Sequence, residues 1–230
     1  MTLPSASFWT ELESRLAKFN LLCHPFYQAW SAGSLTRDDL REYAADYYHH
    51  VAAFPAYLSA FHSRLDDGEL RRAVLRNLCD EEIEGTAHSD LWLQFAEGMG
   101  GSVESVRESQ PAAEVSELIG GFRQIASEGS KAEALAAFYA YESQVPRVAK
   151  AKFEGLKEMY GADDRTCAYF KLHQTADVHH SRVWRDLLEK ELTADPAARE
   201  QALSAAENTA AALWNALSGI EAKRQKRLAA

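Results

Sequence analysis

The chain has 230 residues, a formal net charge of −9 and an apolar fraction of 47%. This length allows one large domain or two small ones with a full hydrophobic core. The acidic charge argues against nucleic acid or an anionic membrane surface as the main partner. Cys23, Cys79 and Cys167 are far apart and odd in number, which argues against a disulfide framework or a zinc knuckle and favours a reducing compartment.

The N-terminal residues MTLPSASFWTELE lack the basic segment and apolar run of a secretory signal. No uninterrupted apolar stretch is long enough to cross a bilayer. We therefore expect a soluble, cytoplasmic protein that binds neither membrane nor nucleic acid.

Helical periodicity begins clearly at residues 36–65, where Thr36 is the expected N-cap and Asp39 completes a capping box. Pro55 predicts a kink or break near the middle of this segment. Residues 69–100 read as a second long helix, ended by the glycines at 98–101, with Gly85 as a weak point inside it.

A polar loop is expected at residues 100–115, followed by four more helical segments. These segments are residues 116–129, 131–161 with a kink at Pro146, 163–192, and 195–224. No segment shows sustained strand alternation. The sequence predicts a single all-α domain over residues 1–230, a helical bundle of about seven helices, with 221–230 as a basic tail that is either a solvated helix end or frayed.

The stretch KLHQTADVHH, residues 171–180, is the first candidate for chemistry. On one continuous helix His173, Asp177 and His180 would lie at about 0°, 40° and −20°, so they would share a face, while His179 would point to solvent. Tyr169 lies on the same stripe, which suggests that this face is buried. The pattern arises by chance about 0.04 times in such a chain, so by itself it leaves a polar helix face and a metal site both open.

The stretch LCDEEIEGTAH, residues 78–88, places Glu81 and His88 on one helix face, with Glu84 as an alternative to Glu81. Read alone, it is as well explained by a solvated acidic face with one histidine. Glu142 lies in the apolar, aromatic context FYAYESQVP, where a carboxylate needs a partner. That partner is either a structural ion pair or a metal ion.

Together these residues form a set of three carboxylates and three imidazoles from three predicted helices. The set is Glu81, His88, Glu142, His173, Asp177 and His180. Mixed oxygen and nitrogen ligands suit iron or manganese, and six ligands suit two ions. Only Asp177 and His180 have the acid-x-x-His spacing that ferritin-like bundles use twice, so a different helical scaffold is expected.

The order and spacing of this series resemble those of the haem-oxygenase-like dimetal oxidases. Within them the chain is most similar to the para-aminobenzoate synthase family typified by the chlamydial protein associating with death domains. The resemblance implies a haem-oxygenase-like fold, shared with TenA and PqqC, and the six residues as ligands of two divalent metal ions, Fe/Fe or Mn/Fe. It further implies dioxygen and an external reductant as co-reactants, and it is compatible with a homodimer.

The resemblance also implies a specific activity. Enzymes of this family are understood to cut the ring from one of their own tyrosines and aminate it with nitrogen from one of their own lysines, for folate biosynthesis, with no free organic substrate. The matching positions are Tyr27 in CHPFYQAW and Lys152 in RVAKAKFEG, and Tyr141 and Tyr43 are candidates for radical relay. Periodicity alone would make Tyr27 a core aromatic and Lys152 a solvated lysine like Lys150.

Three other readings remain open at this point. A dimetal oxygenase of the same scaffold would act on a free amine, amino acid or fatty acid and would not need Tyr27 or Lys152. A metal-free TenA-like hydrolase would use Cys79 or Cys167 as its nucleophile. A non-enzymatic interaction protein finds no supporting feature in the sequence.

Overall fold

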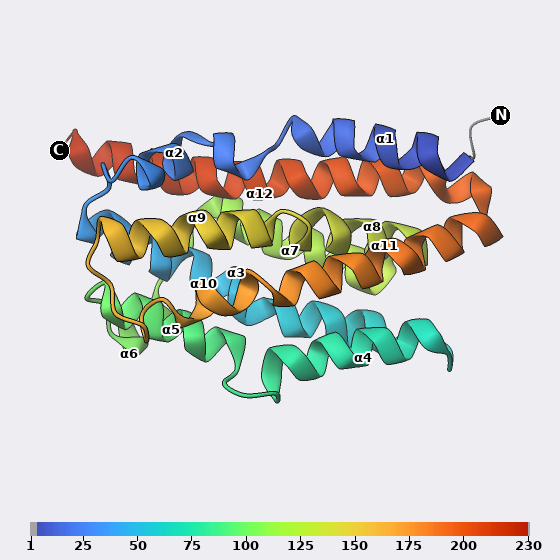
Figure 1. The fold of residues 1–230 in the computed structure, drawn as a ribbon, viewed down its shortest axis with the longest axis horizontal. Coiled ribbons are helices and arrows are strands. Elements are labelled where there is room, and N and C mark those ends of the chain that lie inside the picture. The colour runs from blue at the N-terminus through green and yellow to red at the C-terminus, as the bar shows by residue number, and fades with distance from the viewer. Residues whose placement is uncertain (1–3, 230) are drawn as a thin grey trace.

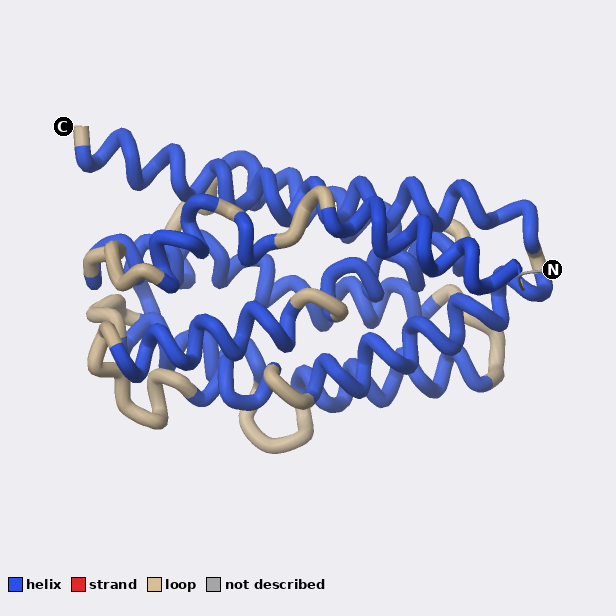
Figure 2. Tube along the Cα trace, turned by 45° about the horizontal axis from the view of Figure 1, so that its top comes forward, coloured by secondary structure: helices blue, strands red, loops and turns tan. Residues whose placement is uncertain are grey.

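The computed structural model describes residues 4–229, so residues 1–3 and Ala230, the ends of the predicted domain, lie outside the described part. That part contains twelve α-helices and two 3₁₀ helices and no strand, which confirms the all-α prediction (Figure 2). The elements are α1 (Pro4–Ala17), η1 (Leu21–Cys23), α2 (Pro25–Ser31), α3 (Arg37–Ser63), α4 (Glu69–Glu82), α5 (His88–Gly98), α6 (Val103–Glu108), α7 (Ala113–Glu128), α8 (Lys131–Glu142), α9 (Val145–Glu158), α10 (Ala168–His173), α11 (Ala176–Ala194), η2 (Pro196–Ala198) and α12 (Arg199–Leu228).

The long helices run along the longest axis of the molecule (Figure 1). Helix α8 packs against α11 and α12, and α7 packs against α3 and α12, so α8 lies inside the bundle. Helix α1 lies beside α12 at one edge, and α4 and α5 pack on α3 at the other (Figure 1). Helix α1 begins and helix α12 ends at opposite ends of the long axis.

The sequence of α8 explains its central position. Its residues 134–141 are alanine, leucine and aromatic residues, all of them buried. A helix that is apolar all round has no face to offer to water and is stable only inside a core. Ser130 caps it in a capping box with Glu133, so it begins sharply at the surface. Its last residue, Glu142, is therefore carried into the interior.

Three of the predicted long helices are each divided in two, and the short helices α2 and α6 are additional, so the described residues form twelve α-helices instead of about seven. Segment 69–100 separates into α4 and α5, joined by a loop in which Gly85 has φ +80°, a conformation that glycine adopts without strain. In segment 131–161 the kink predicted at Pro146 is instead a new helix start, since Pro146 lies in the first turn of α9, where its missing N–H leaves no bond unmade.

Segment 163–192 also divides, into α10 and α11, so the single helix predicted there is wrong. The hydroxyl of Thr175 donates to the carbonyl of Leu172 at 3.2 Å, and such local side-chain bonds compete with helical backbone bonds.

The break predicted at Pro55 is absent: α3 continues through this buried residue. The predicted loop 100–115 contains the short helix α6, which is capped by Ser102.

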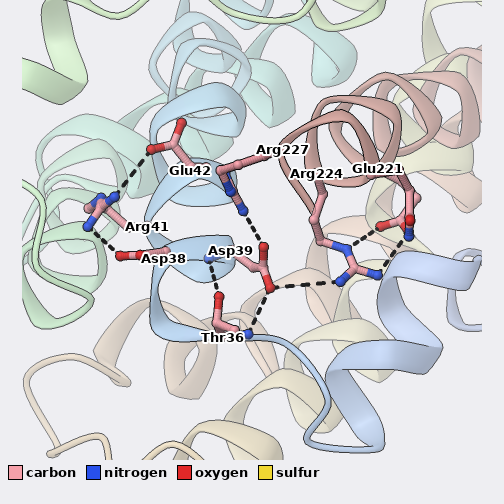
Figure 3. Close-up of polar contacts among 9 residues, drawn as sticks. Thr36, Asp38, Asp39, Arg41, Glu42, Glu221, Arg224 and Arg227 are labelled. Carbon is pink, nitrogen blue, oxygen red and sulfur yellow. Dashed lines mark hydrogen bonds and ion pairs between the residues drawn. The ribbon is translucent and has the colours of Figure 1, made fainter. Parts of the chain in front are cut away.

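The first turn of α3 is fixed by the last turns of α12 (Figure 3). The predicted capping box is confirmed: the Thr36 backbone N–H donates to Asp39 Oδ2 at 2.8 Å, and the Asp39 N–H donates to Thr36 Oγ1 at 3.1 Å. Arg227 donates to the same carboxylate, and Arg224 lies 3.8 Å from it. Residues 221–228, expected as a basic tail, are thus the end of α12 and are paired with α3.

A second buried carboxylate on α3, Asp46, accepts hydrogen bonds from Lys223 at 2.7 Å and from the Ala112 backbone N–H at 2.9 Å. Asp39 and Asp46 are therefore held about two turns apart on α3, on either side of Tyr43.

Among residues 4–229, no helix combines the length and the apolar character that a bilayer span requires.

We expect Asp39→Ala to lower the free energy of unfolding by about 1–3 kcal/mol, because the change removes the cap of α3 and leaves Arg227 without its partner. Urea denaturation followed by circular dichroism measures this loss. Asp38→Ala is the matched control, since the Asp38 side chain is 65% exposed in the same turn; it should change stability by less than about 0.5 kcal/mol. Equal losses in the two variants would contradict the assigned role of Asp39.

Candidate metal centre

All six predicted ligand residues are buried, and the structure gathers them into two clusters of three. The first cluster consists of Glu81, His88 and His173, whose ligand atoms lie within 4.8 Å of one another. Glu81 lies in the last turn of α4, His88 is the first residue of α5, and His173 is the last residue of α10. The His88 Nδ1 atom lies 2.8 Å from Glu81 Oε2, and the two imidazole rings are 4.6 Å apart.

The second cluster consists of Glu142, Asp177 and His180, also within 4.8 Å of one another. Glu142 ends α8, and Asp177 and His180 lie in the first turns of α11. The His180 Nδ1 atom is 3.4 Å from Asp177 Oδ1 and 3.9 Å from Glu142 Oε1. The predicted His–Asp–His face is therefore shared between two helices, and His173 belongs to a different cluster from its two sequence neighbours.

The two clusters meet at one small cavity of about 10 Å³. Its lining includes Glu81 and His173 from the first cluster and Glu142 and Asp177 from the second. The alternative ligand Glu84 is exposed in the loop after α4 and joins neither cluster. His179 is exposed on α11, as expected.

Several buried ligand atoms have no hydrogen-bond partner in the structure. They are His88 Nδ1, Asp177 Oδ2 and His180 Nδ1. His88 Nδ1 lies close to Glu81 Oε2 but is not aligned with it for a hydrogen bond. A buried polar atom without a partner is unfavourable by about 1–3 kcal/mol, and three such atoms facing two small clusters are what a pair of cations would satisfy. Oxygen and nitrogen donors of this mixture suit iron or manganese. The residues present therefore fit a dimetal site.

The electrostatics of the second cluster point the same way. Burial raises the pKa of Glu142, an effect that the His180 charge opposes and Asp177 reinforces. Burial lowers the pKa of His180, but the nearby carboxylates of Asp177 and Glu142 outweigh burial and raise it overall. Without a metal ion, protons bound to Glu142 and His180 balance the negative charge of the second cluster. A bound cation would replace them, so metal loading should release protons.

The first cluster holds its imidazole in the form that binds metal. Burial lowers the pKa of His173, which favours the neutral ring. Its Nδ1 lies 2.8 Å from the Tyr169 carbonyl oxygen. A carbonyl only accepts, so the proton is on Nδ1 and the lone pair of Nε2 is free for a ligand.

Two residues that hold Glu142 were missed in the sequence. Asn77 Nδ2 donates to Glu142 Oε1 at 3.1 Å, and the indole N–H of Trp184 donates to Glu142 Oε2. Asn77 lies one helical turn before Glu81 on α4, which was the available signal. Trp184 lies on the buried face of α11, but its partner on another helix could not be read from spacing.

A second polar site is enclosed by aromatic side chains and contains Tyr27, Tyr43 and Lys152. The Tyr27 and Tyr43 hydroxyls are 3.1 Å apart, and the Lys152 ammonium nitrogen, Nζ, donates to the Tyr43 hydroxyl. Nζ lies 4.3 Å from the centre of the Tyr27 ring. Six aromatic rings surround Nζ at centroid distances of 4.3 to 5.7 Å. Lys152 is thus a buried residue, unlike the solvated lysine that periodicity suggests.

A series of tyrosines connects the two sites. Tyr169 stacks on His173 with ring centres 4.0 Å apart. Tyr169, Tyr141 and Tyr47 line one small cavity. Tyr47 then stacks on Tyr43 at 5.6 Å. The predicted relay residues Tyr141 and Tyr43 are therefore linked through Tyr47, and Tyr169 continues the series to His173; neither Tyr47 nor Tyr169 was predicted as part of the relay.

Fold and site define the class of protein to which the chain belongs. Residues 41–214 match the family described as "Iron-containing redox enzyme", which covers most of the chain, so the protein belongs to this family of enzymes. The two buried clusters, seen on that family background, indicate a dimetal site.

The chain is also similar to individual proteins over most of its length. The chain is 40% identical to the "4-aminobenzoate synthase" of Chlamydia pneumoniae over 92% of this chain and 94% of that protein. It is 38% identical to the "4-aminobenzoate synthase" of Nitrosomonas europaea, over 93% and 91% of the two chains. A crystal structure from Shewanella denitrificans, described as a domain with a heme oxygenase-like fold, matches with a TM-score of 0.81 at 15% identity over 98% and 95%. The predicted family and haem-oxygenase-like fold are confirmed.

His180→Ala is expected to reduce the metal bound after loading with Mn(II) from about two ions per chain to about one, because the second cluster loses its only imidazole. Elemental analysis of the dialysed protein gives this ratio. His179→Ala changes the exposed neighbouring residue and should leave the ratio unchanged. The site assignment fails if His179→Ala loses as much metal as His180→Ala.

The burial of Lys152 predicts a pH-dependent stability. Burial lowers the pKa of Lys152 well below its usual 10.5. At pH values between the lowered pKa of the folded protein and 10.5, the unfolded chain therefore binds one more proton than the folded one. The free energy of unfolding must then rise with pH in this window, and the penalty for burying Lys152 must shrink. Lys152→Met, measured metal-free, should be more stable than wild type by a margin that narrows by about 1.4 kcal/mol per pH unit.

Urea denaturation of the metal-free proteins between pH 7 and 10 measures this margin. The control is Lys150→Met, two residues away, whose side chain is 66% exposed. Its stability relative to wild type should not change with pH. A constant margin for Lys152→Met would show that Lys152 is protonated in the folded protein.

Proposed function

We propose that the protein is an oxygen-dependent para-aminobenzoate synthase that consumes its own side chains. Tyr27 supplies the ring and Lys152 supplies the amine, with two divalent metal ions, Fe/Fe or Mn/Fe, dioxygen and an external reductant. The observation that carries the proposal is that Lys152 Nζ lies 4.3 Å from the Tyr27 ring centre in an enclosure with no room for a free substrate. The names of the relatives from C. pneumoniae and N. europaea support the product.

The size of the enclosure argues for an internal substrate. The cavity lined by Tyr27, Tyr141 and Lys152 has a volume of about 30 Å³, and the cavity between the clusters about 10 Å³. Sites for small organic ligands usually measure about 300–1,000 Å³. The hollow of about 690 Å³ between α7 and α12 lies elsewhere, and no candidate site residue lines it. A dimetal oxygenase acting on a free amine, amino acid or fatty acid is therefore less well supported.

The surroundings of Lys152 favour the chemical form that amination needs. Only a deprotonated amine is a nucleophile, and burial among aromatic rings lowers the pKa of Lys152. The Tyr43 hydroxyl accepts its hydrogen bond and so orients Nζ beside Tyr27. An amine held this close to the ring needs no binding step, which makes the reaction effectively unimolecular.

The product defines the bonds that change. Para-aminobenzoate carries its carboxyl carbon opposite its nitrogen, and in Tyr27 the Cβ atom lies opposite the phenol oxygen. Cβ would become the carboxyl carbon, so the Cα–Cβ bond of Tyr27 breaks and Cα takes a hydrogen in its place. Nζ would replace the phenol oxygen, which leaves as water, and the Cε–Nζ bond of Lys152 breaks as Cε is oxidised to an aldehyde. One dioxygen is the oxidant for Cβ, and a second, with two electrons from the external reductant, is the oxidant for Cε; a bound dimetal centre would supply their activation. The released product would serve folate biosynthesis.

The tyrosine series gives Tyr27 a connection to the metal centre. Tyr27 itself contacts neither cluster, so an oxidising equivalent would have to cross the intervening phenols. Tyr169 stacks on His173 and shares one cavity lining with Tyr141 and Tyr47. Tyr47 stacks on Tyr43, whose hydroxyl is 3.1 Å from that of Tyr27. This extends the relay proposed for Tyr141 and Tyr43 by two residues.

A TenA-like thiol hydrolase is less well supported than the redox function. Burial raises the pKa of the Cys167 thiol, which disfavours the reactive thiolate. Cys79 lies on α4, but neither cysteine lines the cavity next to Lys152. The orphaned ligand atoms of the two clusters would also have no role in such an enzyme.

The decisive experiment measures para-aminobenzoate from the purified protein with no organic substrate added. The protein is supplied with Fe(II), with or without Mn(II), together with dithiothreitol and oxygen. Wild type should form product and show an intact-mass loss that matches removal of the Tyr27 side chain together with loss of the Lys152 amine, and Tyr27→Phe should form none. Tyr48→Phe, a change at a buried tyrosine of α3 outside the site, should behave as wild type.

Each alternative outcome has a distinct meaning. Equal product from wild type and Tyr27→Phe would keep the activity but assign the ring to another tyrosine. No product from metal-loaded wild type would reject the self-consuming reaction and favour an oxygenase that acts on a free small molecule.

A further inference from the structure

Helix α4 contributes to both clusters, although it supplies a ligand to only one. Glu81 belongs to the first cluster. Asn77 and Asp80, on the same helix, reach the second cluster: Asn77 donates to Glu142, and Asp80 Oδ2 lies 2.9 Å from His180 Nε2. Asp80 was not a candidate in the sequence, where it appears only as one of several acidic residues beside Glu81.

The two nitrogens of His180 face different surroundings. Nε2 faces the Asp80 carboxylate, whereas Nδ1 faces Asp177 and Glu142 at 3.4 and 3.9 Å and has no hydrogen-bond partner. A carboxylate accepts but does not donate, so a neutral His180 must carry its proton on Nε2 and its lone pair on Nδ1. Nδ1 is therefore the nitrogen available to a cation in the second cluster.

His173, in the first cluster, is arranged in the opposite way. His173 Nδ1 is bound to the Tyr169 backbone carbonyl, which leaves Nε2 as the available nitrogen. The partner of His173 is a neutral main-chain group that no substitution removes. The partner of His180 is a charged side chain that is 36% exposed. A carboxylate partner orients a ligating imidazole and raises its basicity more than a carbonyl does.

We propose that Asp80 is a positioning residue for the second metal position. It fixes the Nε2–H tautomer and the ring orientation of His180, so that Nδ1 binds the cation held with Glu142 and Asp177. This inference rests on the dimetal centre of the proposed function, but not on the identity of the product. It assigns Nδ1 of His180 and Nε2 of His173 to the metal ions and makes only the second cluster dependent on Asp80.

The test measures metal affinity at each position without any assay of product. Co(II) is titrated into the metal-free full-length protein and followed by its visible absorption. Wild type should bind two ions per chain. Asp80→Ala should weaken one of the two by about 10- to 100-fold and leave the other unchanged. Asp80→Asn, which keeps an oxygen acceptor but removes the charge, should lie between wild type and Asp80→Ala.

Glu82→Gln is the matched control. Glu82 is an exposed acidic residue two positions away on α4, so the change removes the same charge from the same helix end without touching His180. Both Co(II) affinities should stay as in wild type. A general electrostatic effect would weaken binding equally in Glu82→Gln and Asp80→Asn, and that result would overturn the proposal.

The tautomer supplies a second readout that a merely structural role would not change. In Zn(II)-loaded protein labelled with 15N-histidine, the His180 signals, assigned with His180→Gln, should show a protonated Nε2 and a metal-bound Nδ1. A metal-bound Nε2 would overturn the proposal. Wild type that binds fewer than two ions would reject both this inference and the dimetal centre, whereas two ions with the Asp80 effect but no para-aminobenzoate would reject only the proposed product.

Discussion

The burial of six ionisable side chains in a helical core is the constraint on which the rest of the structure depends. Each ligand residue is 5% exposed or less, and charged groups removed from water need partners. Glu81 and Glu142 lie in the last turns of their helices, where the helix dipole also disfavours negative charge. Histidine and hydrogen-bond donors supply part of the compensation, and the orphaned ligand atoms show where cations would supply the remainder.

The fold meets this constraint by placing several of the ligand residues at the ends of helices. His88 begins α5, Glu142 ends α8 and His173 ends α10, so the chain stops or starts a helix wherever it must direct a ligand inward. Side chains at helix ends approach from several directions, which allows three donors to converge from separate helices. The short breaks around Gly85 and Thr175 are therefore part of the site and not interruptions of the scaffold.

The two clusters and the surroundings of Lys152 are neighbouring environments that favour opposite charge states: the clusters favour bound cations, and the aromatic rings favour an uncharged amine. Around the clusters, carboxylates and imidazoles create a polar site suited to cations. Around Lys152, aromatic rings exclude water and favour an uncharged amine. Tyrosines suit the region between them, because a phenol packs as an apolar ring and still offers a hydroxyl. Tyr141 and Tyr169 line both small cavities, so the polar and the aromatic sites meet at these two side chains.

The sequence by itself determined the helical class, the capping box at Thr36 and the identity of the six candidate ligands, because helical periodicity, caps and unusual buried acids are local signals. The resemblance of the whole series, and not any periodicity, drew attention to Tyr27 and Lys152. Only the tertiary structure decided that His173 separates from Asp177 and His180, that Lys152 is buried, and that Asp80 faces His180. Each of these depends on where a helix ends or which helix lies opposite, and those contacts join residues far apart in the chain.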